Sequence, residues 1–382
     1  MHLPGSKLPG IGTTIFTIMS KMAQDCGAIN LSQGFPDFDG PELLRERVNY
    51  HLRHGHNQNA PLAGVPELRE QIALKVLDLY ACRIDPDTQV AVTPGATEAI
   101  FCAVSTVVHQ GDEVIVFDPA YDTYEPSVTL NGGITHHIPM LYPDFRIDWQ
   151  RVEDTINNRT RLIILNSPHN PSGSQWNEQD IQSLRRLVAG RDILLISDEV
   201  YEHITFDNKQ HLSLLRYPDL AQRSFVISSF GKTYHATGWR VGYCIAAPAL
   251  MAEFLKIHQF INFSTNTPMQ YAIADFLRDC PQFHHELGGF YQRKRDLFCQ
   301  LLEPSRFRLI ASTGTYFQLA DYREISDEND IDFARRLTRE QGVAVIPISV
   351  FYQRPQQQQV IRFCFAKHED TLHEAAKRLI VL

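Results

Sequence analysis

The sequence predicts an α/β protein in which a large domain with a mostly parallel sheet is joined to a smaller α+β domain. Three strongly apolar runs, residues 113–117, 161–165 and 193–197, have the length of strands and are separated by helical segments. Strands of this composition are typical of parallel sheets that helices cover on both faces. Alternating strands and helices favour right-handed crossovers, which bring the carboxyl ends of the strands to one edge.

The chain changes character beyond about residue 280. A charged helical segment at residues 287–302 precedes short segments that alternate like strands, at 307–310, 315–319 and 360–366. This pattern indicates a second, smaller α+β domain. We therefore expect a large domain over residues 41–280, and a small domain formed by residues 1–40 and 281–382 with an N-terminal arm.

The composition is ordinary for a soluble globular enzyme, with 43% hydrophobic and 21% charged residues in a chain of 382. A net charge of -8 gives no reason to expect a nucleic-acid partner. The seven cysteines form no Cys-x-x-Cys pair, which disfavours a disulfide framework and a zinc site and favours a reducing cytoplasm. No signal-peptide pattern or bilayer-length apolar run is present, so we expect no membrane association.

The N-terminal third contains two features that bear on a binding site. Residues 11–24 have apolar side chains at helical spacing, which predicts an amphipathic helix packed on the body. The loop at residues 30–39 follows, and its Gly34 allows the backbone to approach a ligand closely. A further helix is expected over residues 68–79.

Polar and aromatic side chains follow the predicted strands. A strand over residues 87–92 leads into a helix at 97–109, whose free N–H groups suit a phosphate, although a simple capped turn is the alternative. Tyr121 follows the next strand, where its ring can stack on a flat ligand or pack in the core. Asp198 and Tyr201 follow the third apolar run, at the edge where parallel sheets bind ligands; a helix cap is the alternative for Asp198.

The segment 228–242 places Ser229, Lys232 and Arg240 among glycines. A P-loop would need a glycine where the chain has Val226, which excludes that motif. The other chemistry that requires one lysine among phosphate-binding groups is a Schiff base with pyridoxal 5'-phosphate. A surface lysine in a glycine-rich loop is the alternative.

Arg362 lies on a predicted strand among apolar residues, where a guanidinium pairs with a planar anion, either a ligand or an internal carboxylate. The histidines at His51, His54 and His56 have no co-ligands at metal spacing and are interpreted as solvated surface. Those of the final helix do not match a zinc-protease motif. We expect no metal site.

Five motifs, in order, resemble those of the class I aminotransferases, a pyridoxal-phosphate family, over about residues 15–366. They are Gly34-Phe35-Pro36-Asp37-Phe38, Gly95-Ala96-Thr97, Asn-x-Pro-x-Asn-Pro-x-Gly at 166–173, Asp198-x-x-Tyr201, and Ser229-x-x-Lys232 followed by Arg240. The first motif resembles the subfamily of glutamine and kynurenine transaminases and bacterial methionine aminotransferases. The resemblance implies the aspartate aminotransferase-like fold, also called fold type I.

The resemblance also implies a role for each matching residue. The cofactor-binding positions it implies are Ala96, Thr97, Tyr121, Asn170, Asp198, Tyr201, Ser229, Lys232 and Arg240. Lys232 is the implied catalytic residue, and Asp198 is implied to pair with the pyridine nitrogen. Arg362 is implied to bind the α-carboxylate of the substrate, assisted by Gly34 and Asn170.

The activity implied by the resemblance is ping-pong transfer of an amino group from an amino acid to a 2-oxo acid, in a homodimer. Aromatic residues are expected to line an apolar pocket, and no second arginine is apparent, which favours methionine and other neutral or aromatic amino acids over aspartate. The aromatic residues are Phe35, Tyr121, Tyr316 and Phe351. The chain departs from the family at Asn59, where a tyrosine normally reaches the cofactor phosphate of the partner subunit.

Three alternatives use the same residues. The first is a β-lyase acting on cysteine S-conjugates, which pyruvate formation without an amino acceptor would reveal. The second is a kynurenine or glutamine transaminase. The third is a non-catalytic pyridoxal-phosphate-binding regulator, against which the joint presence of Lys232, Asp198, Tyr201 and Arg362 argues.

Overall fold

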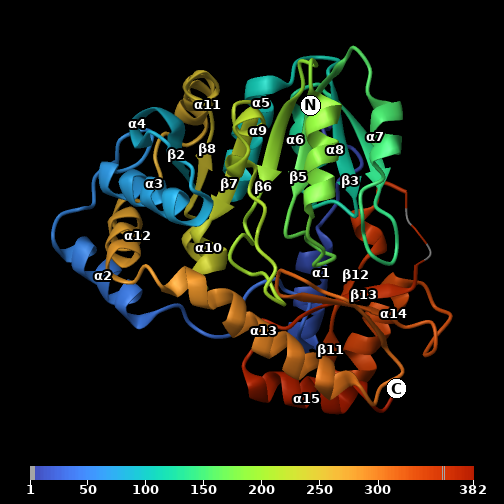
Figure 1. Ribbon diagram of the computed structural model, residues 1–382. Coiled ribbons are helices and arrows are strands. Elements are labelled where there is room, and N and C mark those ends of the chain that lie inside the picture. The colour runs from blue at the N-terminus through green and yellow to red at the C-terminus, as the bar shows by residue number, and fades with distance from the viewer. Residues whose placement is uncertain (1–4, 355, 357) are drawn as a thin grey trace.

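The computed structural model describes residues 5–354, 356 and 358–382 (Figure 1). Its centre is a seven-stranded sheet in the order β2-β8-β7-β6-β5-β3-β4. The strands are β2 (Val90–Thr93), β3 (Glu113–Asp118), β4 (Ile134–Pro139), β5 (Thr160–Asn166), β6 (Leu194–Asp198), β7 (Ser224–Ser229) and β8 (Gly242–Ile245). Neighbouring strands are parallel except at β8, which runs antiparallel to β2 and β7. The predicted α/β class with a mostly parallel sheet is confirmed.

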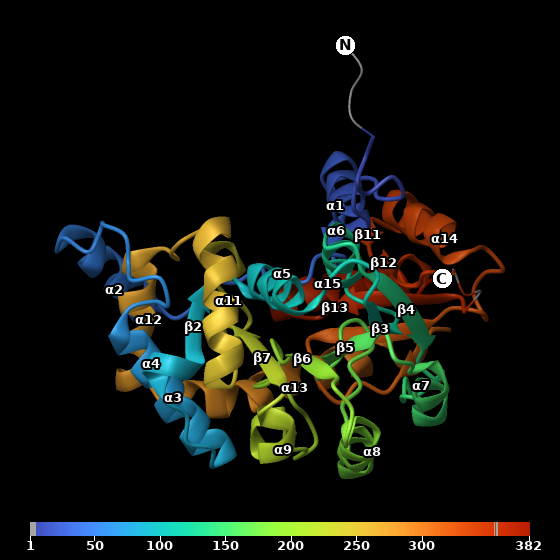
Figure 2. The ribbon, with the colours of Figure 1, turned by 90° about the horizontal axis from the view of Figure 1, so that it is seen from above.

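Helices cover both faces of this sheet (Figure 2). Because successive side chains of a strand point to opposite faces, Ile115 and Phe117 of β3 enter one core while Val114 and Val116 enter the other. The helices of this part are α2 (Glu42–Arg53), α3 (Pro66–Tyr80), α4 (Pro86–Gln89), α5 (Ala96–Val107), α6 (Tyr124–Leu130), α7 (Trp149–Thr155), α8 (Glu178–Val188), α9 (Pro218–Ala221), α10 (Phe230–Thr233), α11 (Pro248–Ile261) and α12 (Thr267–Asp279). Buried strands under two helical layers explain why these runs are apolar throughout.

A second sheet lies below the first in Figure 1. It is antiparallel and has the order β12-β13-β10-β9. These strands are β9 (Arg308–Ile310), β10 (Phe317–Asp321), β12 (Ile346–Pro347) and β13 (Val360–Cys364), and the helices around them are α13 (Phe283–Leu302), α14 (Asp330–Arg336) and α15 (Glu369–Leu379). The predicted α+β character of the last third is therefore present.

The N-terminal segment joins the C-terminal third. Strand β1 (Ile29–Asn30) pairs in parallel with β11 (Val343–Ala344). Helix α1 (Ile15–Asp25), capped by the side chain of Thr14, contacts β11 and β12. Two ends of the chain that are far apart in sequence thus build one region beneath the large sheet.

Two local expectations were wrong. The strand predicted to begin at Asp87 begins at Val90, because the Asp85 carboxylate accepts hydrogen bonds from the Asp87 N–H at 2.9 Å and the Thr88 hydroxyl at 2.8 Å and so starts a helical turn. His51 is buried rather than solvated, and its Nε2 lies 2.8 Å from Oδ2 of Asp275.

Over the residues that the structure describes, no helix combines the length and the apolarity that crossing a bilayer requires.

Candidate active site

The loops that follow the strands of the large sheet meet around one cavity of about 560 Å³. Every predicted cofactor-binding residue lines it, namely Ala96, Thr97, Tyr121, Asn170, Asp198, Tyr201, Ser229, Lys232 and Arg240. They come from the start of α5 and from the segments after β3, β5, β6 and β7. The cavity therefore lies at the edge where parallel α/β sheets bind ligands.

Lys232 is held by α10, a single helical turn at the end of β7. Ser229 caps this turn, because its Oγ accepts a hydrogen bond from the Gly231 N–H at 3.2 Å. A capped turn directly after a buried strand has little freedom, so the position of the lysine follows from the sheet. Ser229 also lines the cavity, so its hydroxyl is placed both to cap the turn and to contact a ligand.

The amine of Lys232 points towards the N-terminal loop and the small sheet. Its Nζ donates to the carbonyl oxygen of Gly34 at 3.2 Å and to the hydroxyl of Tyr316 at 3.1 Å. Burial, reinforced by the charges of Arg240 and Arg362, lowers the pKa of Lys232 to about 8. A lysine with this pKa supplies a substantial fraction of neutral, nucleophilic amine near neutral pH.

Asp198 ends β6 and is buried. The Tyr124 hydroxyl donates to its Oδ2 at 2.7 Å, and the Val200 N–H donates to its Oδ1 at 3.3 Å. Burial raises the pKa of Asp198 to about 6, while these two donors act in the opposite direction. A carboxylate held in this way at a cavity wall suits a ligand group that carries a proton on nitrogen.

Close backbone packing forms the polar end of the cavity. Gly95 has φ +81°, and a Cβ there would lie 2.8 Å from Nη2 of Arg240. A Cβ at Gly242 would lie 2.8 Å from the backbone N of Ala96. These glycines let the exposed Arg240 and the first turn of α5 converge, with Nη2 of Arg240 within 3.5 Å of Oγ1 of Thr97. A guanidinium beside a helix N-terminus suits a phosphate.

Arg362 on β13 is fully buried. Its Nη1 donates to Oδ1 of Asn170 at 2.8 Å and its Nη2 to the Ser32 carbonyl at 3.1 Å, while its Nε has no hydrogen-bond partner among the described residues. Burial lowers the pKa of Arg362 to about 10, so it stays charged at neutral pH. Gly34 lies beside it, where a Cβ would come within 2.9 Å of the Phe317 ring. A charged guanidinium with an unused donor is suited to bind a carboxylate.

Aromatic rings surround the lysine and the arginine. Tyr201 and Tyr316 meet edge to face with ring centroids 5.2 Å apart, and Phe351 lies 5.7 Å from the Arg362 guanidinium. Burial raises the pKa of Tyr201 and of Tyr121, so both hydroxyls stay protonated. Phe35, which was expected to line the pocket, is instead 43% exposed and packs beside Lys367.

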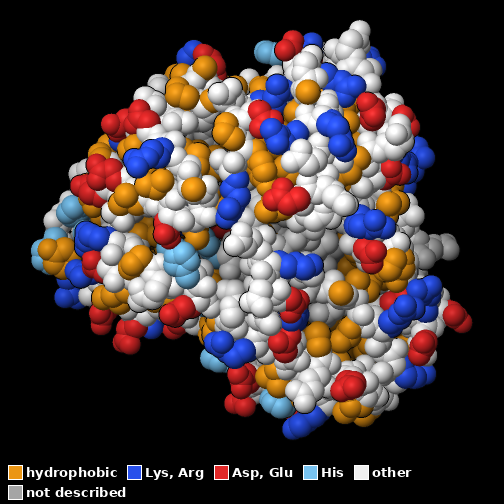
Figure 3. Space-filling model, viewed as in Figure 1, with side chains coloured by type: hydrophobic (Ala, Val, Ile, Leu, Met, Phe, Trp, Pro, Cys, Tyr) orange, Lys and Arg blue, Asp and Glu red, His pale blue; other side chains and the backbone are white. Residues whose placement is uncertain are grey.

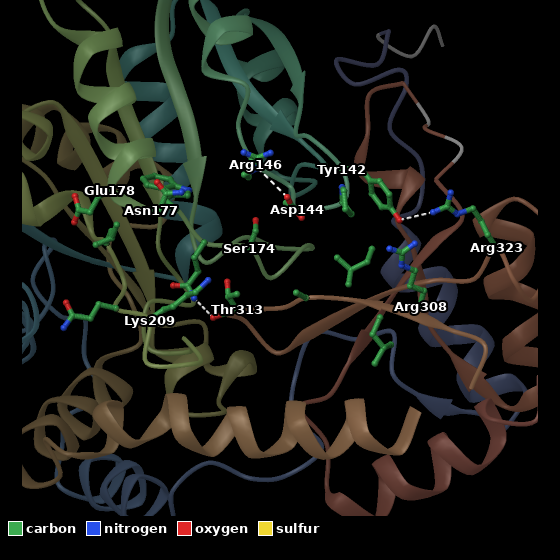
Figure 4. A pocket seen from close by; sticks show the side chains of 18 residues that line it. Tyr142, Asp144, Arg146, Ser174, Asn177, Glu178, Lys209, Arg308, Thr313 and Arg323 are labelled. Atoms are coloured by element: carbon green, nitrogen blue, oxygen red, sulfur yellow. Dashed lines mark hydrogen bonds and ion pairs between the residues drawn. The ribbon is translucent and has the colours of Figure 1, made fainter. Parts of the chain in front are cut away.

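A larger cavity contains none of these residues. Its empty volume is about 1910 Å³, and it lies between the loops below β4 and β5 and the strand β9 (Figure 4). Its side chains of opposite charge include Arg146, 3.6 Å from Asp144, and Arg323, which pairs with Asp321. The space-filling view shows acidic and basic groups interspersed on this face (Figure 3). The larger of the two cavities is therefore not the one that contains the lysine, the buried aspartate and Arg240.

Two residues of the site escaped the sequence analysis in the roles they have here. Tyr124, the hydrogen-bond donor to Asp198, is separated from it by 74 positions. Tyr316 was expected only to line an apolar pocket, yet its hydroxyl donates to the Gly34 carbonyl at 2.6 Å and contacts the lysine. No sequence motif links these two tyrosines to the site residues. They reach the site because α6 and the small sheet pack against it.

Comparison with known proteins agrees with this geometry. Residues 27–379 match the family model of aminotransferase class I and II. The methionine aminotransferase of Escherichia coli is 51% identical over 99% of this chain and 98% of its own length. Human kynurenine–oxoglutarate transaminase 3 is 32% identical over 98% of this chain and 89% of its own.

Solved structures show the same relationship. The structure of an Escherichia coli protein with methionine aminotransferase function has a TM-score of 0.98 and 50% identity, covering all of both chains. An aspartate aminotransferase from Thermus thermophilus has a TM-score of 0.90 at 27% identity, again over the full length of both chains. The chain belongs to the class I and II aminotransferase family, has the aspartate aminotransferase-like fold, and is an aminotransferase.

Proposed function

We propose that this aminotransferase binds pyridoxal 5'-phosphate in the cavity at the large-sheet edge and transfers the amino group of methionine, or another neutral or aromatic amino acid, to a 2-oxo acid. The observation that carries the proposal is the convergence of a lysine, a buried carboxylate and a guanidinium beside a helix N-terminus around one cavity. This donor set fits the three polar parts of the cofactor, which are its aldehyde, its ring nitrogen and its phosphate.

Each group would then hold one part of the cofactor. Asp198 would accept the proton-bearing ring nitrogen, and Asn170 and Tyr201 would donate to the phenolic oxygen. The phosphate would lie against Ala96, Thr97, Ser229 and Arg240, and the Tyr121 ring would cover the face of the pyridine. When bound, the cofactor supplies an aldehyde that condenses with amines and a ring that stabilises negative charge developing on the α-carbon of the substrate.

The residues of this chain would bind the substrate and move its proton. Arg362 orients the amino acid through its α-carboxylate, with Asn170 and Gly34 beside it. Lys232 would accept the proton of the α-carbon at its Nζ as general base and, as general acid, donate the same proton to the carbon that carried the aldehyde. A pKa of about 8 suits both roles, because the amine gains and loses a proton readily near neutral pH.

The surroundings of Arg362 favour a neutral side chain in the substrate. Arg362 stacks on Phe317 at 3.9 Å and has Phe16 and Phe351 within 5.7 Å. Asp122, which is exposed on this chain, interacts with the charge of Arg362, so an acidic group also lies near the carboxylate-binding position. Apolar rings together with a carboxylate disfavour a second negative charge and accept a thioether or an aromatic ring.

The test compares half-reactions of the cofactor-loaded protein with methionine, kynurenine and aspartate, each followed by the change in visible absorption. We expect kcat/KM to be highest for methionine or an aromatic amino acid and lowest for aspartate. A preference for aspartate would contradict the pocket argument. Pyruvate release from a cysteine S-conjugate without a 2-oxo acid would establish the β-lyase alternative instead.

We also propose that the enzyme is a cytoplasmic homodimer with a large domain at residues 41–280 and a small domain formed by 1–40 and 281–382. Exposed apolar side chains near the end of α11 support an interface, since Phe260 is 85% exposed and Ile261 and Phe263 are above 40%. Asn59 is exposed on its own chain, as a residue that reaches a partner would be. Sedimentation of the full chain tests the proposed homodimer. A monomer at micromolar concentration would refute the dimer.

A further inference from the structure

A cluster of two histidines and one aspartate lies apart from the cavity that holds Lys232. Asp78 is near the end of α3, and His284 and His285 are in the first turn of α13. Each residue offers one ligand atom, and these atoms all lie within 4.8 Å of one another. Asp78 and His285 are 207 positions apart, so no metal-ligand spacing is visible in the sequence here, and no metal site was predicted.

His284 is the unusual member. It is only 5% exposed, yet neither its Nδ1 nor its Nε2 has a hydrogen-bond partner among the described residues. A buried polar group left unpaired is costly, so such groups normally face a ligand or a water. An imidazole with both nitrogens unpartnered keeps one of them available to bind a metal ion.

Asp78 and His285 provide the open side of the cluster. Their side chains are 61% and 49% exposed, and Nε2 of His285 lies 2.9 Å from Oδ2 of Asp78. A tetrahedral zinc ion with bonds of about 2.0–2.1 Å separates its ligand atoms by about 3.4 Å. Because these two side chains are exposed, they have room to rotate towards that spacing, and solvent access leaves room for a water as the remaining ligand.

The neighbouring charges permit a cation. Lys75 is the nearest buried cation, but its Nζ donates to Oε1 of Glu202 at 2.8 Å, so this pair is neutral overall. His203, whose ring centroid is 5.1 Å from that of His284, contacts the same pair, with its Nε2 3.2 Å from Nζ of Lys75. The carboxylate of Asp78 therefore supplies the uncompensated charge at the cluster.

We propose that Asp78, His284 and His285 form a binding site for a divalent transition metal, with Zn²⁺ as the ion that this ligand set fits best. Two imidazoles and one carboxylate with an open fourth position form a recurrent zinc ligand set. The ion would fasten the start of α13 to the end of α3. Since α13 also packs against α15 beneath the small sheet, bound metal would stabilise the junction between the two halves of the molecule.

The test uses chelator-treated, cofactor-loaded protein. Zn²⁺ is titrated against a chromophoric chelator, and the thermal midpoint is measured with and without the ion. We expect one ion per chain and a higher midpoint when it is bound. Asp78→Asn and His285→Gln change exposed side chains and leave folding intact, and each should weaken binding by more than the roughly 10- to 100-fold typical of outer ligand-shell substitutions.

A matched control separates this site from adventitious binding. His373→Gln removes an exposed histidine on α15, and Cys102→Ser removes the thiol of a second group, Glu98, Cys102 and His258, whose ligand atoms also lie within 4.8 Å. Both controls should bind Zn²⁺ like the parent protein. The proposal is overturned if no tight ion binds, or if Asp78→Asn and His285→Gln bind it as well as the controls do.

Discussion

The two sides of the active site are built in different ways. The groups placed at the large-sheet edge, such as Asp198 and Lys232, stand within a few residues of a buried strand, and each is fixed by its own strand and turn. Arg362 instead lies on a strand of the small sheet and is held by contacts with Asn170 and Ser32, which come from other parts of the chain. The positions of Asp198 and Lys232 are therefore set by residues close to them in the chain. The position of Arg362 depends on contacts between the large-sheet and small-sheet parts of the molecule.

This difference suggests that the large-sheet side binds the cofactor and that the small-sheet side binds the substrate. The geometry of the groups on the large sheet is set by their own strands and turns, which suits the binding of a permanent cofactor. Arg362 and Tyr316 keep theirs only while the halves are in contact, which suits a substrate that must enter and leave. Substitutions on the two sides should therefore affect different observables.

The sharpest test of the comparison is Arg362→Ala. Removing one partner of a buried charged interaction costs about 2–5 kcal/mol, so kcat/KM for methionine should fall roughly 30- to 5000-fold. Cofactor affinity should change little. The control is Arg308→Ala, an exposed arginine on the same small sheet, which should behave like the parent. If cofactor loss accompanied the fall in kcat/KM, the separation between the two sides would be wrong.

Tyr124→Phe tests the large-sheet side. It removes the 2.7 Å hydrogen bond to Asp198, and a bond to a charged group is worth about 1.5–3 kcal/mol, so the pKa of Asp198 should rise by roughly 1–2 units. At pH 7 the ionised fraction of Asp198 then falls from about nine-tenths to between about a half and a tenth, so cofactor affinity should drop about 2- to 10-fold and recover as the pH is raised. The ring-nitrogen NMR shift of labelled cofactor reports this directly.

Tyr142→Phe provides a matched control for that variant. Tyr142 also donates to an aspartate, Asp321 at 2.9 Å, but lies outside the cavity that holds Lys232. Its loss should leave both the affinity and the pH dependence unchanged. Equal behaviour of the two variants would show that the Tyr124 hydroxyl does not act on the cofactor site.

A pH dependence follows from Lys232. Burial places its pKa near 8, so the neutral amine predominates above pH 8 and decreases about tenfold per unit below it. The rate at which cofactor-free protein incorporates pyridoxal 5'-phosphate should rise with pH and level off above about 8. A midpoint near the ordinary lysine value of about 10.4 would mean that the amine is not desolvated as the structure shows.

The smallest expected effect concerns Asn59. If its side chain faces the cofactor phosphate of a partner subunit, Asn59→Tyr should slow cofactor loss on dialysis by a few-fold, because the longer phenol reaches further. Gln58→Tyr adds the same ring one position away and should have no effect. Unchanged retention in Asn59→Tyr would show that other groups already hold the phosphate.

The sequence was most informative where chemistry and secondary structure lie close together in the chain. The apolar runs predicted the strands, and Tyr121, Asp198 and Lys232, which follow them in the chain, line one cavity together with Asn170, a position that the family resemblance implied. The family resemblance, rather than spacing, supplied their roles.

Features that arise from packing between distant segments could not be predicted. Tyr124 reaches Asp198 only because α6 folds back over the strand ends, and His51 is buried only because α2 packs on α12. Phe35 lies in a glycine-containing loop whose side-chain direction no periodicity specifies. In each case the deciding contact is long-range, and a single sequence does not encode it as a pattern.

The central claim is that Lys232 carries the cofactor. Borohydride reduction of the cofactor-loaded protein, followed by peptide mass spectrometry, tests it most directly. We expect one pyridoxyl group per chain, on Lys232, and none after Lys232→Ala. Attachment to another lysine, or no covalent attachment at all, would contradict it.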